Sequence, residues 1–157
     1  MVYLKKQSIM ENNKTIIISA CLAGVKCRYN SQDAYNDILL DELNQYLIII
    51  SCPEVLAGLP TPRNACNIHG GDGNDVLKGT AKIIGMDGKD YTNAYIEGAR
   101  KVLEIALKFQ IKKAYLRKNS PSCGNGQIYS EDGTKLIHGD GVLSALLKQN
   151  QIDIISL

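Results

Sequence analysis

The sequence shows no strong imbalance of charge and no long hydrophobic run. Eighteen basic and sixteen acidic residues give a formal net charge of +2, far below the basic excess of proteins that bind the phosphate backbone of nucleic acids. The longest apolar runs, residues 15–20 and 47–50, are much shorter than the roughly 20 residues that span a bilayer. We therefore expect neither a nucleic-acid partner nor a membrane span.

The N-terminal segment lacks the apolar core of a signal peptide. Lys5 and Lys6 are followed by polar residues that interrupt any such core. We therefore expect a flexible N-terminal extension over residues 1–13, a single domain over 14–157 and a cytoplasmic protein. With 45% hydrophobic residues, a chain of this length can bury one ordinary core.

Short apolar runs alternating with amphipathic segments predict the fold class. Buried strands are expected over residues 15–20, 47–51, 114–116 and 152–156. Helices are expected over 33–46, 91–109 and 141–149, a short strand over 80–86 and a hairpin over 128–137. Thr92 or Asn93 is the expected cap of the long helix. The pattern is typical of a three-layer α/β/α sandwich with a mainly parallel, Rossmann-like sheet.

Glycine and proline dominate residues 52–79. Such a composition predicts mostly loop, with one short turn of helix. The glycine-rich residues 70–73 are interpreted as a flexible flap, because neither a strand before them nor a helix after them is evident. We expect residues 70–73 and residues 59–63 to determine which ligand is bound.

Five cysteines remain without an obvious pairing. No CxxC motif is present, so the usual ferredoxin and zinc-ribbon patterns are not indicated. In a reducing cytoplasm such thiols are metal ligands, catalytic groups or core residues rather than disulfides.

Cys21, Cys52 and Cys123 each follow an expected strand. Parallel strands deliver the segments after their carboxyl ends to one crevice, so these three thiols are expected to converge. Three thiolates suit a soft metal and leave a coordination position open, and both zinc and an iron–sulfur cluster fit that shell. The alternative is that they are buried small residues at strand ends.

The other two cysteines do not follow strands. Cys27 is interpreted as a buried or supporting thiol, with a redox or sulfur-relay role as the less favoured alternative. Cys66 is interpreted as an incidental residue of a loop.

Groups suited to proton transfer lie next to the thiols in sequence. Glu54 follows Cys52 by two residues and is either a general base or a carboxylate at a helix start. Ser120 and Ser122 precede Cys123 and either bond a substrate or cap the loop. Further candidates are Arg28 and Arg63, for binding an anion or pairing with a carboxylate, and the isolated histidines His69 and His138, which are more typical of core or surface residues.

Four segments together resemble a small bacterial family linked to thiouracil desulfidase, formerly catalogued as a domain of unknown function. They are ACLAGVKCRYN at 20–30, CPEVLAGLPTPR at 52–63, NSPSCG at 119–124 and GDGV at 139–142. The resemblance implies a single α/β domain in which Cys21, Cys52 and Cys123 hold a [4Fe-4S] cluster whose fourth iron is open. It further implies Glu54 and Ser120 as catalytic residues, with Ser122 as the alternative to Ser120.

The activity implied by the resemblance is removal of sulfur, as sulfide, from a thiolated pyrimidine such as 2-thiouracil or a related thioamide, without net redox. Two other interpretations of the same thiols stay open: a metal- or sulfide-binding module without turnover, and a zinc-dependent hydrolase with a three-cysteine shell. Cys66 is an alternative fourth ligand, since a thiol at that position is not part of the resemblance.

Overall fold

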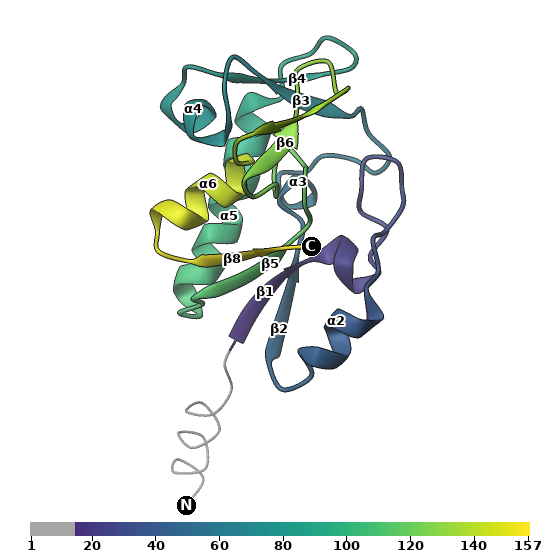
Figure 1. Cartoon of the computed structure of the whole chain (residues 1–157), viewed down its shortest axis with the longest axis vertical. Helices are drawn as coiled ribbons and strands as arrows, with labels where there is room; N and C mark the ends of the chain where they lie inside the picture. The colour runs from purple at the N-terminus through teal and green to yellow at the C-terminus, as the bar shows by residue number, and fades with distance from the viewer. Residues whose placement is uncertain (1–14) are drawn as a thin grey trace, which may run out of the picture.

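The computed structural model describes residues 15–157, so the expected extension over residues 1–13 lies outside the described residues. Four parallel strands form the main sheet in the order β2-β1-β5-β8 (Figure 1). They are β1 (Thr15–Ser19), β2 (Leu47–Ser51), β5 (Lys113–Leu116) and β8 (Asp153–Ser156). Each was predicted to within one residue at either end, because a strand buried on both faces is a continuous apolar run.

Helices cover both faces of this sheet. Ile17 of β1 packs into the core formed with α5 (Thr92–Lys108) and α6 (Val142–Gln149). Its neighbours Ile16 and Ile18 point to the other face, where they pack against the short helix η1 (Ala20–Ala23) and α2 (Asp37–Glu42). The predicted α/β/α sandwich with a parallel sheet is therefore confirmed.

The helix expected over 33–46 is shorter than predicted. The Asn36 side chain accepts a hydrogen bond from the Leu39 backbone N–H at 2.9 Å and caps α2 there, so the residues before Asn36 are not helical. For α5 the predicted cap is wrong. The Thr92 hydroxyl instead accepts from the Ile83 N–H, and Asp90 accepts from the Thr92 N–H.

The order of the strands creates a crevice at one edge of the sheet. The chain runs from β1 to β2 on one side and then crosses back to β5 on the other side of β1. Segments that leave β1 and β5 therefore diverge, and open α/β sheets bind ligands at such a point. Because all four strands are parallel, η1, the short helix α3 (Pro53–Leu56) and the segment after β5 all begin at this edge.

Residues 52–79 are more ordered than the sequence suggested, and the prediction of mostly loop is wrong. They contain α3, β3 (Cys66–His69) and α4 (Gly73–Lys78), and β3 pairs antiparallel with β4 (Lys82–Gly85). Asp72 accepts from the N–H groups of Asn74 and Asp75, and Asp75 accepts from the Asp72 N–H. This reciprocal capping starts α4, so residues 70–73 link a strand to a helix and are not a flap.

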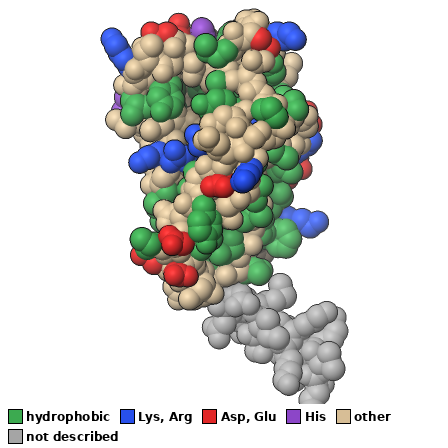
Figure 2. Space-filling model, turned by 90° about the vertical axis from the view of Figure 1, so that its right-hand side faces the viewer, with side chains coloured by type: hydrophobic (Ala, Val, Ile, Leu, Met, Phe, Trp, Pro, Cys, Tyr) green, Lys and Arg blue, Asp and Glu red, His purple; other side chains and the backbone are tan. Residues whose placement is uncertain are grey.

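Two small antiparallel sheets of two strands each lie beyond the carboxyl ends of the parallel strands (Figure 1). One pairs β3 with β4, which are joined through α4, and the other is the predicted hairpin, formed by β6 (Gln127–Tyr129) and β7 (Leu136–His138). No helix within residues 15–157 has the length and apolar character needed to cross a membrane. On the face shown in Figure 2, charged side chains of both signs are dispersed among hydrophobic and polar ones.

A glycine allows α3 to pack closely on α5. A Cβ atom built at Gly98 of α5 would overlap the carbonyl group of Pro53, the first residue of α3. The contact is reinforced by Lys101, whose Nζ donates to the Leu56 carbonyl at 2.9 Å. The absence of a side chain at Gly98 therefore lets α3, which follows Cys52 and carries Glu54, lie directly against α5.

We expect Gly98→Ala to lower the free energy of unfolding by about 1–3 kcal/mol, because the added methyl group forces α3 and α5 apart. Urea unfolding of the purified protein measures the change. Arg100→Ala, at an exposed position of the same helix, is the matched control and should change stability by less than about 0.5 kcal/mol. Equal stability of the Gly98→Ala variant and the unmodified protein would contradict the proposed contact.

Candidate functional site

A cavity of about 500 Å³ lies at the carboxyl edge of the main sheet. Its walls come from the segments that follow β1, β2 and β5, and from the two small antiparallel sheets beyond them. All five cysteines line it, namely Cys21, Cys27, Cys52, Cys66 and Cys123. The expected convergence of three thiols at one edge of the sheet is therefore found, and two further thiols join them.

The three cysteines that follow strands are held by local structure. Cys21 lies in η1, and Cys52 is the N-cap residue of α3. Around Cys123, the Ser19 hydroxyl donates to Sγ at 3.6 Å, and the Ser120 hydroxyl accepts from the backbone N–H at 2.7 Å. The parallel strands and these bonds thus fix the thiols without any bond between the three.

Cys27 occupies a place that the sequence analysis did not anticipate. Its thiol lies next to the thiols of both Cys21 and Cys52. The interaction with Cys27 lowers the pKa of Cys21, whereas the interaction with Cys21 raises the pKa of Cys27 and the interaction with Cys27 raises that of Cys52. The three thiols are therefore electrostatically coupled.

Burial dominates the chemistry of the remaining two thiols. It raises the pKa of the Cys123 thiol to about 12 and also raises the pKa of Cys66. Cys66 begins β3, lines the cavity, lies next to the buried Tyr95, and its thiol donates to the Asn64 carbonyl at 3.6 Å. Burial also raises the pKa of Tyr95 well above its ordinary value. The prediction that Cys66 is an incidental loop residue is thus wrong about its place, because β3 was not foreseen.

Glu54 is held in place by two side chains. The Ser122 hydroxyl donates to Oε1 at 2.9 Å, and Arg63 Nε donates to Oε2 at 2.7 Å. The Glu54 and Arg63 side chains are only 13% and 7% exposed, so the ion pair is largely removed from water. A carboxylate with two fixed partners keeps one orientation at the cavity wall.

Arg63 connects this ion pair to the segment after β1. Its Nη2 donates to the Cys27 carbonyl at 2.8 Å, and its backbone N–H donates to the Tyr29 carbonyl at 2.9 Å. Of the two roles considered for Arg63, the structure shows pairing with a carboxylate. Arg28 also lines the cavity and donates to the Asp33 carbonyl at 3.3 Å.

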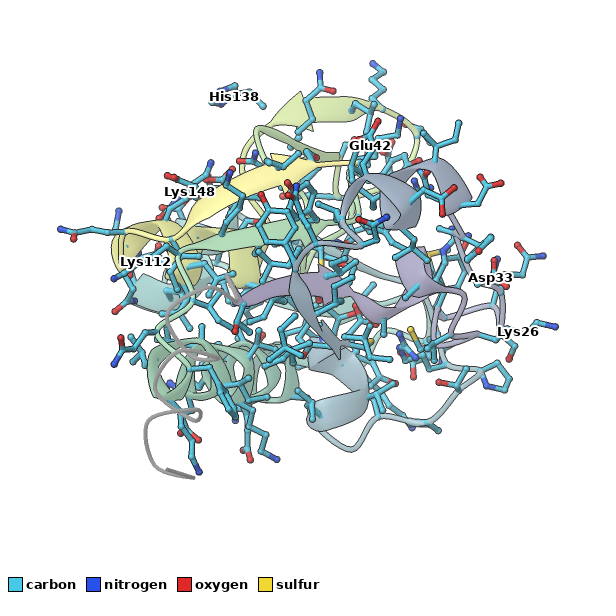
Figure 3. All side chains as sticks on the ribbon, turned by 90° about the horizontal axis from the view of Figure 1, so that it is seen from below. Lys26, Asp33, Glu42, Lys112, His138 and Lys148 are labelled. Atoms are coloured by element: carbon cyan, nitrogen blue, oxygen red, sulfur yellow. The ribbon has the colours of Figure 1, made fainter. Side chains whose placement is uncertain are left out.

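The two serines near Cys123 take different positions. Ser120 lines the cavity, whereas Ser122 is 3% exposed and lies behind Glu54. The histidines lie elsewhere: His69 is 3.7 Å from Glu131, and His138 is exposed at the periphery of the molecule (Figure 3). Residues 70–73 do not line the cavity, and of residues 59–63 only Arg63 does. The prediction that these two segments determine specificity is therefore largely wrong.

Ser51, the last residue of β2, was missed by sequence reasoning. Within residues 15–157 its hydroxyl is the one buried side-chain N or O atom without a hydrogen-bond partner, and the residue lines the cavity. The available signal was a polar residue at the end of an apolar strand, directly before a candidate ligand. The prediction of a buried thiol at Cys27 is confirmed, but its loop position gives no indication that it returns to Cys21.

The donor set suits a group larger than one ion. The part of the chain that the structure describes has no group of three His, Cys, Asp or Glu side chains arranged to hold a single metal ion. In an iron–sulfur cluster each protein thiolate binds a different iron, so the ligands need not converge on one point. Three thiols spread around a cavity with an unpaired hydroxyl in its wall fit such a group.

The chain is similar to proteins of one family. A family model described as 2-thiouracil desulfurase matches residues 16–157. An uncharacterized protein of Bacillus subtilis (strain 168), YbbK, is 44% identical over 144 residues, which cover 90% of this chain and 94% of YbbK. A solved structure of TudS, described as a [4Fe-4S]-dependent thiouracil desulfidase, superposes with a TM-score of 0.81 at 33% identity, covering 92% of this chain and 91% of TudS.

We expect Arg63→Met to lower the free energy of unfolding of the metal-free protein by about 3 kcal/mol, because it leaves the mostly buried Glu54 carboxylate without its charge partner. Arg63→Lys should lose less, since it keeps the charge but not the forked geometry. Urea unfolding measures both. Lys82→Met removes the exposed pair with Asp90 and, as the control, should cost less than about 1 kcal/mol; a similar loss in both Met variants would refute the buried pair.

Proposed function

The chain belongs to the 2-thiouracil desulfurase family, and on that basis we propose that it is an iron–sulfur-dependent desulfidase that releases sulfide from a thiolated pyrimidine or a related thioamide. The observation that carries the proposal is that thiols from the ends of three parallel strands share one cavity with a fixed carboxylate. TudS, which is described as [4Fe-4S]-dependent, has the same fold at 33% identity. Residues 14–157 form the desulfidase unit, and the reducing cytoplasm suits its free thiols.

Cys21, Cys52 and Cys123 would hold a [4Fe-4S] cluster. Each comes from a different strand end, and each lines the cavity. When bound, the cluster supplies an iron without a protein ligand, a Lewis acid that prefers soft sulfur.

Glu54 acts as the general base. Its carboxylate lines the cavity, where it accepts a proton from the water molecule that attacks the carbon bearing sulfur. The overall reaction exchanges the thiocarbonyl sulfur for the oxygen of water and releases hydrogen sulfide, so no electrons are gained or lost. Ser122 and Arg63 keep the carboxylate oriented, because each donates to a different oxygen of Glu54.

Ser120 contacts the substrate, and Ser122 does not. The Ser120 hydroxyl lines the cavity and accepts from the Cys123 N–H, which leaves its proton free to donate to a polar atom of the substrate. Ser122 uses its proton for Glu54 and is a positioning residue. A cavity of about 500 Å³ lies in the ordinary range for small-molecule sites, which suits one thiolated base.

Anaerobic reconstitution should load the protein with iron and acid-labile sulfide in equal amounts. Cys21→Ser, Cys52→Ser and Cys123→Ser should each abolish this loading, because each removes the sole thiolate of one iron. Cys27→Ser and Cys66→Ser are matched controls at the same cavity and should still be loaded. Elemental analysis and visible absorption measure the outcome. Loading that depends on Cys27 or Cys66 but not on Cys123 would overturn the ligand assignment.

The rate of sulfide release from 2-thiouracil by the loaded protein distinguishes the roles of the polar residues. Glu54→Gln should lower the rate roughly 10²- to 10⁴-fold without loss of iron, because the amide cannot accept the proton. Ser120→Ala should raise the substrate concentration needed for half-maximal rate, and Ser122→Ala should mainly lower the maximal rate. Full activity of Glu54→Gln would exclude its role as base. Absence of sulfide release from the fully loaded unmodified protein would exclude this substrate.

A further inference from the structure

The free hydroxyl of Ser51 points to a second kind of contact with the cluster. Ser51 is 7% exposed and lines the cavity next to Cys52. Its Oγ is buried and has no hydrogen-bond partner within the described residues 15–157. A buried hydroxyl without a partner destabilises a protein, so its place in this wall indicates a partner that residues 15–157 do not provide.

The neighbouring strand shows what such a hydroxyl does at this edge. Ser19 and Ser51 are register partners at the ends of β1 and β2, so both side chains point to the same face of the sheet. The Ser19 hydroxyl accepts from the Arg117 N–H at 3.0 Å and donates to Cys123 Sγ at 3.6 Å. One serine of the pair thus already bonds the sulfur of an expected ligand, while the other is free.

We propose that the Ser51 hydroxyl donates a hydrogen bond to a sulfur atom of the cluster, next to the Ser19 hydroxyl, which bonds the sulfur of Cys123. The proposal rests on the proposed function, because the acceptor is the cluster. Hydrogen bonds to the sulfurs of an iron–sulfur centre disperse its negative charge and raise its reduction potential. Ser51 is therefore a residue that holds and tunes the cluster and is not one of its ligands.

The test compares Ser51→Ala with Ser51→Thr, which keeps a hydroxyl on the same backbone position. In the loaded protein, Ser51→Ala should shift the midpoint potential of the cluster to a more negative value. It should also speed anaerobic loss of iron to a chelator by about two- to tenfold, the effect of one hydrogen bond. Ser51→Thr should stay close to the unmodified protein in both measurements.

The metal-free protein gives an opposite and independent readout. There Ser51→Ala removes a hydroxyl that has no partner, so its unfolding temperature should equal or exceed that of the unmodified protein. An unfolding temperature clearly below that value would show that the hydroxyl already has a structural partner and would overturn the proposal.

Two further outcomes would overturn the proposal. One is an unchanged midpoint potential and an unchanged rate of iron loss in Ser51→Ala. The other is a Ser51→Thr variant that behaves like Ser51→Ala, because the effect would then come from packing. These results leave the proposed function intact as long as the unmodified protein loads iron and releases sulfide. Failure of the unmodified protein to load would instead refute the proposed function itself.

Discussion

The ion pair between Glu54 and Arg63 is the interaction on which the site depends. Its two side chains connect three segments that are distant in the sequence: Glu54 follows β2, Arg63 bonds the Cys27 carbonyl in the segment after β1, and Ser122 after β5 completes the bonds to Glu54. A buried pair of this kind contributes little net stability by itself, yet losing one partner is costly. The pair therefore fixes the relative positions of three loops whose thiols must face one cavity.

The parallel sheet explains how chemistry-bearing residues so distant in sequence can be juxtaposed. The cavity extends over both faces at the edge of the sheet, since Cys21 packs with the core on the α2 side and Cys123 with the core on the α5 side. β1 and β2 each end in a serine just where the apolar run stops. The same edge thus places the thiols and these two serines at the cavity wall, and no single segment contains a complete site.

The sequence predicts the parts of this arrangement that depend on short continuous runs of apolar residues. Strands β1, β2, β5 and β8 are short apolar runs, and their parallel order places Cys21, Cys52 and Cys123 together. The β3 strand at Cys66 escaped prediction because it is four residues long and stabilised by pairing with β4, a contact that local composition does not reveal. Cys27 returns to Cys21 by a loop whose path depends on Arg63, so its place requires tertiary structure.

The fold and the site rest on different interactions. The two cores consist largely of aliphatic side chains on either face of the sheet, and neither core contains a charged group. The backbone of Cys123 is held at the edge by two side chains: the Ser120 hydroxyl accepts from its N–H, and the Ser144 hydroxyl donates to its carbonyl. Such bonds form when the chain folds and need no metal. The loop that carries Cys123 is therefore ordered by contacts within the chain, so the proposed cluster would not have to order it.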